Sequence, residues 1–280
     1  MRTPITLTII FLIPLSHFAR AEWRLEAETG AVYDSNLSNS DRGTDVRDDF
    51  AWRSDVVAGN AVQLARDLRL SLGADARGEV WDRFDAFNTI GAGTSAGLRY
   101  RFGLGRRAPW ILLEDRLGYD WFHDSAQSGS DNVTNLRAGI ALSDRIALEA
   151  GYEFESFVAP NNFYDRQLHR GNAHIFFDVT SSLQVALGYT YREGDVISYA
   201  VPPRPDIAPF AIEREDETEF GLPLRTAYKF VARTHALSVS LAYQLTKRAS
   251  FQLSYEYALT TRDPVQYENH LFEAKIAVAY

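Results

Sequence analysis

Cysteine is absent from the 280-residue sequence, and methionine occurs only once. Without cysteine the chain holds no disulfide, and it lacks the residue that carries the lipid of a bacterial lipoprotein. After residue 21 there is also no run of 18 or more apolar residues, which excludes a transmembrane helix. Apolar residues at helical spacing are scarce, so helices are not expected to build the fold.

Basic residues are outnumbered, because 29 Lys and Arg stand against 37 Asp and Glu. Loss of a leader carrying Arg2 and Arg20 would bring the net charge to about −10. This balance argues against a nucleic-acid partner and against a basic patch for anionic membrane surfaces. The sequence has no spaced histidine cluster, phosphate loop or nucleophile elbow, so it predicts neither a metal nor a cofactor.

The chain begins with a predicted leader. Arg2 precedes the apolar segment ITLTIIFLIPL, and Ala19-Arg20-Ala21 forms a small-residue cleavage site. This order is that of a secretory signal peptide. We therefore expect residues 1–21 to be removed and residues 22–280 to form the exported protein.

Strict alternation of apolar and polar residues dominates the remainder. In WRLEAETGAVY, Trp23, Leu25 and Ala27 share one face of an extended chain, and Arg24 and Glu26 share the other. A soluble β-sandwich would turn its apolar face to a core. A membrane barrel turns that face to lipid and the polar face to water, and the charge on the polar rows favours the barrel.

The alternation predicts the fold class: an all-β, transmembrane, antiparallel, up-and-down β-barrel of about 12 strands. An even number of strands, joined alternately by short and long connections, is typical of bacterial outer-membrane barrels. We expect the longest connection, 194–231, to be an extracellular loop with a local hairpin, although 216–231 is an alternative extra strand. The predicted strands are 22–34, 49–64, 67–82, 89–103, 109–123, 132–143, 145–157, 167–179, 182–193, 232–245, 248–260 and 268–280.

Aromatic residues gather near both ends of the predicted strands, as in the girdles of membrane barrels. Trp23 and Trp110 mark one end, and Trp81 and Trp121 mark the other. Asp115 falls in a lipid-facing row, where an unpaired charge would cost about 2 kcal/mol or more. We expect a β-bulge beside Asp115 to turn it inward.

The closing stretch FEAKIAVAY alternates to its last residue, with Phe272, Ile276 and Tyr280 on one face. It resembles the C-terminal strand signal that the barrel assembly machinery recognises in Gram-negative outer-membrane proteins. The stretch AVYDSNLSNSD resembles the opening of barrel porins and of the barrel of surface-lipoprotein assembly modifiers. These resemblances imply a location in the cell outer membrane, with outer-membrane lipid and the assembly machinery as partners.

The charged rows leave two functions open. They can sort small polar or charged solutes that diffuse through a porin or channel. Alternatively, they neutralise one another in a closed barrel that acts as an assembly or secretion partner, because twelve strands lie between filled and open barrels. The proline-rich stretch of 194–231 either constricts the mouth or stays outside it. The predicted pore-lining residues are Arg53, Asp75, Arg77, Arg99, Arg101, Arg116, Asp120, Arg137, Glu149, Glu153, Arg170 and Arg192.

One motif suggests an enzyme instead. In WFHDSAQSGSDN, His123 and Ser125 share a face, and Asn132 opens the next strand. The stretch is similar to the His-x-Ser motif of outer-membrane phospholipase A, which is also a twelve-stranded barrel. That resemblance implies Ser125 as the nucleophile, His123 as the base and Asn132 as the orienting group of a lipid hydrolase. We prefer the porin and keep the hydrolase as an alternative.

Overall fold

The computed structural model describes residues 22–280, so the predicted leader at 1–21 lies outside the described residues. In the described range, no helix combines the length and hydrophobicity needed to cross a membrane. The strands are β1 (Glu22–Asp34), β2 (Asp49–Ala65), β3 (Leu68–Trp81), β4 (Thr89–Arg101), β5 (Trp110–Phe122), β6 (Gly129–Ala141), β7 (Ile146–Val158), β8 (Arg166–Asp178), β9 (Leu183–Ala200), β10 (Ile212–Glu217), β11 (Arg225–Gln244), β12 (Ala249–Arg262) and β13 (Val265–Ala279). Three single-turn helices are η2 (Asp85–Phe87), η3 (Ser125–Gln127) and η4 (Asn162–Tyr164).

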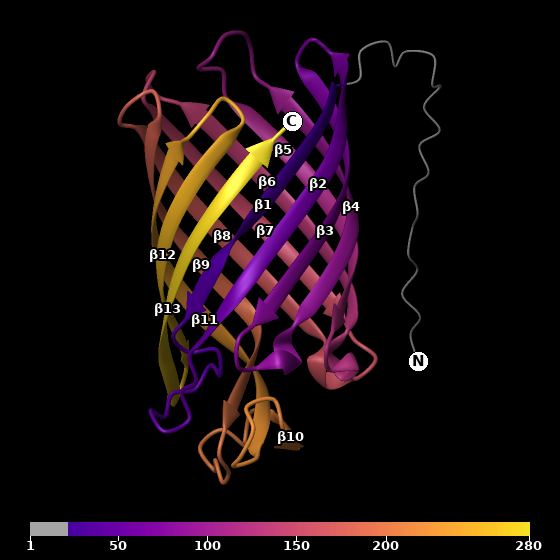
Figure 1. Ribbon diagram of the computed structural model, residues 1–280, viewed down its shortest axis with the longest axis vertical. Coiled ribbons are helices and arrows are strands. Elements are labelled where there is room, and N and C mark those ends of the chain that lie inside the picture. Colours follow the sequence, from indigo (N-terminus) through magenta and orange to yellow (C-terminus); the bar gives the residue numbers. More distant parts are fainter. Residues whose placement is uncertain (1–21) are drawn as a thin grey trace.

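All of these strands except β10 close into one antiparallel barrel of twelve strands (Figure 1). Neighbours pair in order from β1 to β9, β9 pairs with β11, and β12 and β13 lead back to β1. The closing pair runs from Glu26 opposite Ala279 to Asp34 opposite Leu271. Closure pairs both edges of the sheet, so the wall offers no free edge to another chain. The predicted all-β barrel is confirmed.

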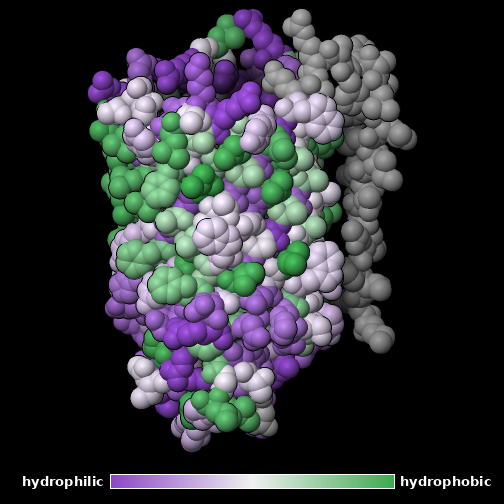
Figure 2. All heavy atoms as spheres, in the orientation of Figure 1, coloured by the Kyte–Doolittle hydropathy of each residue, from purple (hydrophilic) through white to green (hydrophobic). Residues whose placement is uncertain are grey.

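The two faces of the wall differ as the alternation predicts. Outward positions carry large apolar side chains, of which Trp23 is 78% exposed and Leu117 is 59% exposed. Figure 2 shows hydrophobic residues spread across the middle of the barrel, between hydrophilic ends. An apolar outer band over a polar inner face is the pattern of a barrel seated in a bilayer.

The two ends of the barrel have different connections. One end, here called the turn end, carries both chain ends of the wall (Figure 1). Its connections are 66–67, 102–109, 142–145, 179–182 and 245–248. The opposite end, here called the loop end, carries 35–48, 82–88, 123–128, 159–165, 201–224 and the two-residue turn 263–264.

The longest connection is shorter than predicted, because both flanking strands extend. β9 continues to Ala200 and β11 begins at Arg225, which replaces the predicted loop 194–231 by a connection of residues 201–224. Within it, β10 pairs with the first part of β11. The alternative of an extra wall strand at 216–231 is not formed: residues 225–231 extend β11, residues 216–217 end β10, and the number of strands in the wall stays even.

The extended strands leave the wall as a two-stranded ribbon. β8 pairs with β9 only as far as Gly194, whereas β9 and β11 stay paired up to Ala200 opposite Thr226. A Cβ on Gly194 would lie 2.1 Å from the backbone oxygen of Gln167, so this close approach requires glycine. The ribbon, residues 195–200 and 226–231, projects past the wall at the loop end (Figure 1).

Three predictions about side-chain direction are wrong. β5 pairs with β4 and β6 without a register shift, so no bulge turns Asp115 inward. Asp115 stays in the outward row, where Thr134 Oγ1 donates a hydrogen bond of 2.6 Å to it. Trp81 is not a girdle residue, because it is buried and lines an interior cavity. Trp110 also leaves the girdle, with the guanidinium carbon of Arg99 4.3 Å from its ring centroid.

Candidate functional site

An ion-pair network covers the inward face of β3, β5 and β6. Arg77 donates to Asp120 from Nε at 3.1 Å and from Nη2 at 2.7 Å. Arg116 bonds both carboxylate oxygens of Asp75, at 2.9 and 2.6 Å, and it also bonds Asp131. The Asp131 side chain is only 3% exposed. Because a buried carboxylate is costly unless it is paired, these two arginines stabilise the three acids.

Similar pairs extend the polar lining around the barrel. They are Arg53 with Glu79 at 2.6 Å, Arg192 with Glu256 at 2.6 Å, Arg170 with Glu153, and Arg137 with Glu114 and Glu149 at 3.9 and 3.8 Å. The structure places all predicted pore-lining residues on the inward face: Arg53, Asp75, Arg77, Arg99, Arg101, Arg116, Asp120, Arg137, Glu149, Glu153, Arg170 and Arg192. Their role in a pore stays a prediction.

Three cavities hollow the interior. A cavity of about 860 Å³ lies at the turn end and is lined by Glu28 and Lys247 among others. A second, of about 490 Å³, contains the Arg77–Asp120 pair. A third, of about 400 Å³, lies next to the ribbon. The second and third cavities share the lining residues Leu37, Phe87, Phe122 and Arg166, so they are neighbours beneath the loop end.

An apolar cluster, here called the cap, covers the lumen at the loop end. Phe220 is central to it: its ring centroid lies 4.8 Å from that of Phe84, 5.1 Å from Phe87 and 5.0 Å from Tyr199. The members come from five connections at this end and from the adjoining strand ends. The cap consists of Leu37, Phe84, Phe87, Phe122, Ala126, Phe157, Ala159, Phe163, Tyr164, Ile197, Tyr199, Phe220 and Ala227.

Three connections supply cap residues through the same local structure. After β3, β5 and β7 the chain makes a single 3-10 turn, and a polar side chain at the end of the turn accepts a backbone N–H. Short polar side chains commonly satisfy backbone donors in this way. The acceptors are Asn88 from Trp81 at 2.6 Å, Ser128 from Phe122 at 2.9 Å and Asp165 from Ala159 at 2.7 Å.

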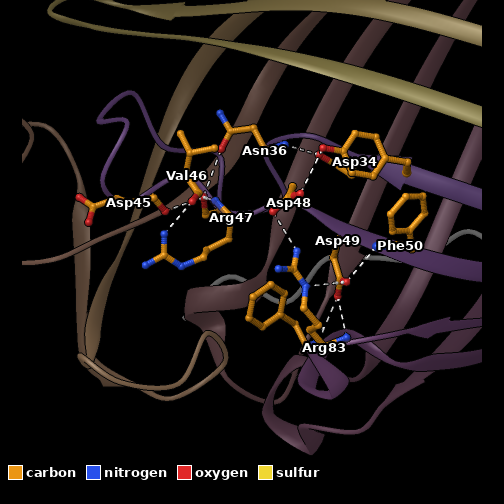
Figure 3. A network of polar contacts seen from close by, with 12 residues as sticks. Asp34, Asn36, Asp45, Val46, Arg47, Asp48, Asp49, Phe50 and Arg83 are labelled. Atoms are coloured by element: carbon orange, nitrogen blue, oxygen red, sulfur yellow. Dashed lines mark hydrogen bonds and ion pairs between the residues drawn. The ribbon is translucent and has the colours of Figure 1, made fainter.

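The first connection, 35–48, folds across the mouth of the barrel. The backbone oxygen of Ser38 accepts a hydrogen bond of 2.9 Å from the backbone N–H of Tyr199 in the ribbon. At its far end, buried Asp49 accepts from the backbone N–H groups of Arg83 and Phe84, each at 3.1 Å, and from the Arg83 guanidinium at 3.3 Å (Figure 3). Asp49 therefore joins the start of β2 to the turn that carries Phe84.

The opposite face of the ribbon is covered as well. The Arg204 side chain is fully buried and bonds Asp41 at 2.8 Å and Asp206 at 2.7 Å. It thereby ties the connection 201–224 to the connection 35–48. A second apolar cluster fixes the ribbon against β13 and contains Ala200, Ile207, Tyr228, Phe230, Ala232, Val265 and Tyr267.

Two buried carboxyl groups lie beside the cap, outside the wall. The Tyr164 hydroxyl is 3.3 Å from a carboxylate oxygen of Glu217 and 3.1 Å from one of Glu219. Arg214 pairs with Glu217 at 2.7 Å, and Gln127 Nε2 is 3.4 Å from Glu219. Burial, together with the hydrogen bond to Glu219, raises the pKa of Glu217 to about 8. The charge of Glu217 therefore changes near pH 8.

The residues of the predicted hydrolase are not assembled. His123 and Ser125 are exposed, and Asn132 donates to Asp115 on the outward face of β6 at 3.2 Å. Within residues 22–280, no hydrogen bond joins the side chains of His123, Ser125 and Asn132. The same range contains no group of three or more His, Asp or Glu side chains arranged to hold a metal ion. The structure gives the triad no support.

The cap is the feature that sequence reasoning missed. Its signal was the presence of large apolar residues in connections that were expected to be polar, such as Phe84, Phe87, Phe163 and Phe220. Loops on a surface seldom gain from aromatic side chains unless these pack together. A search for aromatic residues between the predicted strands would have found most of the aromatic members of the cap.

Comparison with known proteins bears on the fold. No family model and no curated protein sequence matches the chain. An outer-membrane channel of Pseudomonas putida F1 superposes with a TM-score of 0.61 at 10% identity, covering 92% of this chain and 95% of that one. The β-domain of the Bordetella autotransporter BrkA gives 0.50 at 13% identity, covering 92% and 99%. The NanC porin gives 0.47 at 11% identity, covering 91% and 98%.

Identities this low carry information about the fold alone. The P. putida channel and the autotransporter domain also show that this fold is not confined to channels. In fold, the chain is thus a closed twelve-stranded antiparallel β-barrel of the kind found in an outer-membrane channel and in an autotransporter domain.

Proposed function

We propose that the protein is a gated channel of the Gram-negative outer membrane, through which small polar or charged solutes diffuse. The observation that carries the proposal is the interior: charged side chains line three cavities inside a wall whose outer surface is apolar. A predicted signal peptide at 1–21 and an alternating C-terminal strand would deliver the chain to the barrel assembly machinery. The apolar band would then hold it in lipid.

Selectivity would come from the arrangement of charge. Arg77 and Arg116 reach across β4 to Asp120 and Asp75, so a passing solute meets both signs at close range. Such an interior favours solutes that exchange one set of ionic contacts for another over solutes that offer none. The cap covers the loop end, so passage requires that the cap opens.

The test is conductance across a planar bilayer with two forms of the protein. In the shortened form, Asn-Gly replaces residues 201–225, so that Ala200 and Thr226 become the last pair of a two-residue hairpin. This deletion removes Phe220 from the cap and leaves the wall intact. We expect brief, rare openings from the intact protein and larger, long-lived steps from the shortened one. Folding of both is checked by the shift in gel mobility on heating.

A silent bilayer with both folded forms would contradict the channel. It would favour the closed barrel that acts as an assembly or secretion partner, which the buried cap and the dense ion pairs of the interior also suit. The lipid hydrolase is not proposed, because His123, Ser125 and Asn132 make no catalytic contact within residues 22–280.

A further inference from the structure

The cavity of about 400 Å³ beneath the cap, here called the capped cavity, has two chemically different sides. Phe122, Phe157 and Tyr199 line it from the cap, and Arg192 and Lys229 line it from the strands. A small cavity with a broad apolar surface and a few convergent polar groups is typical of sites for small molecules. Its contents are therefore expected to be amphipathic.

The charged part of the lining is mainly cationic. Both of its carboxylates already accept hydrogen bonds from backbone N–H groups: Asp165 from Ala159 at 2.7 Å and Asp195 from Gln167 at 2.9 Å. The charged lining residues are the cations Arg166, Arg170, Arg192 and Lys229 and the anions Asp165 and Asp195. Three of these cations already pair with acids next to the lining, so Lys229 carries the one positive charge of the lining that no acid of the described residues balances, and this favours an anionic occupant.

Several of these cations have hydrogen-bond donors to spare. The Nε atoms of Arg170 and Arg192 are buried and have no partner within residues 22–280, although each guanidinium pairs through another nitrogen. Lys229 is 9% exposed, and its ammonium donates to the backbone oxygen of Asp165. Among the ion pairs of the described residues, none includes Lys229. A buried ammonium without a counter-ion is unfavourable, and a bound anion would relieve it.

We propose that the capped cavity binds a small organic anion with a planar apolar body, of which an aromatic carboxylate is the simplest form. The carboxylate would accept from Lys229 and from the spare nitrogens of Arg170 and Arg192, since charge-assisted hydrogen bonds are the strong ones. The ring would pack against Phe122 and Phe157, because aromatic pairs add to simple burial. An inorganic anion would make no contact with the apolar side of the cavity, and a neutral aromatic molecule would bring no negative charge to its cationic side.

This inference rests on the proposed function and narrows it to a class of solute. The capped cavity and its neighbour share Phe122 and Arg166, so the site adjoins the rest of the lumen. The anion would lie directly below the cap, where its ring touches the residues that hold the cap together. Binding can nevertheless be measured without any conductance, so the two proposals can fail separately.

The experiment is calorimetric titration of the folded mature protein in detergent micelles with benzoate, benzyl alcohol and sulfate. Benzoate carries both a ring and a charge, benzyl alcohol lacks the charge, and sulfate lacks the ring. We expect saturable binding of benzoate and at least tenfold weaker binding of the other two. Equal binding of benzyl alcohol would overturn the role of the cations, and equal binding of sulfate would overturn that of the apolar side. Absence of benzoate binding would overturn the inference.

A matched pair of variants locates the site. We expect Lys229→Gln to weaken benzoate binding about tenfold or more, the usual effect of losing a charged hydrogen bond. Loss of the Lys229 charge leaves no carboxylate without its ion-pair partner. The control variant Lys247→Gln, at an exposed turn of the opposite end, should leave benzoate binding unchanged. Undiminished binding by folded Lys229→Gln would refute this location. If that variant does not fold, the three ligands on the unmodified protein still decide.

The outcomes separate the two proposals. Selective benzoate binding by a protein that never conducts would refute the proposed channel and support the proposed binding site. Conductance by a protein that binds none of the three ligands would refute the proposed binding site and support the proposed channel.

Discussion

The Arg116→Met substitution offers a measure of how dry the interior is. Arg116 holds both oxygens of Asp75 and also bonds Asp131, and these three side chains are 15%, 16% and 3% exposed. Methionine keeps most of the volume of the side chain and removes the charge. Asp131 is then left with Arg77 alone, 3.5 Å away.

The expected loss follows from that burial. Removing one partner of a buried ion pair typically costs about 3–5 kcal/mol, because the other charge stays buried without compensation. A loss of about 3 kcal/mol would change the folding equilibrium by about two powers of ten. Combining Arg116→Met with Asp131→Asn should recover part of this loss, because the least exposed carboxylate is then neutral.

The assay is urea-driven unfolding of the barrel in lipid vesicles, followed by tryptophan fluorescence. The control is Arg107→Met, whose partner Asp144 lies 3.2 Å away on the surface, with the two side chains 58% and 75% exposed. Exposed pairs contribute about 0–1 kcal/mol, so this variant should unfold almost like the parent. A loss no larger for Arg116→Met than for Arg107→Met would refute the reasoning, and it would show an interior hydrated enough to screen its charges.

Three further predictions concern the cap and the outer wall. The raised pKa of Glu217, about 8 against an ordinary 4.5, means that folding favours its protonated form, so the packing around it should weaken as pH rises from 4.5 to 8. Trypsin cleavage after Arg214 should accelerate over that range in the parent relative to Glu217→Gln, and comparing the two proteins at each pH cancels the pH dependence of the protease itself. Asp49→Ala should strand the backbone donors of Arg83 and Phe84, cost about 1–3 kcal/mol and raise the open fraction in conductance traces, whereas an unchanged open fraction would show that the cap does not need this link. Thr134→Val should leave Asp115 under-bonded on the outward face and lower stability to urea by about 1 kcal/mol or more, unlike Thr94→Val, an exposed outward position opposite Leu117, and equal stability of the two variants would contradict the role assigned to Thr134.

Most of the wall could be predicted from the sequence, for a local reason. A strand shows its two faces within a few residues, and the inward charges Arg53, Arg77 and Asp120 were recognised from alternation alone. Errors appeared where the same alternation of apolar and polar residues fits two different structures. The predicted strands 182–193 and 232–245 stop where β9 and β11 leave the wall at Gly194, but the sequence did not show that both strands continue past it as a paired ribbon.

The directions assigned to Trp81 and Asp115 failed because side-chain direction depends on neighbouring strands. Trp81 is of a residue type that is common in girdles, but its register opposite Ala51 sets its side chain on the inward face. Asp115 was expected to turn away from the outward face, yet it stays there, because Thr134 on the neighbouring strand donates a hydrogen bond to its carboxylate. In both cases the deciding partner lies on another strand.

By itself, the sequence determined a closed barrel with an apolar exterior and a charged interior, because a period of two is a property of each strand and needs no partner. Only the tertiary structure decided that the loop end carries a cap. The contacts that build it, such as Ser38 with Tyr199 and Phe84 with Phe220, join residues more than a hundred positions apart. No local pattern encodes such pairs, since they form only after the closed wall has brought the connections together over one opening.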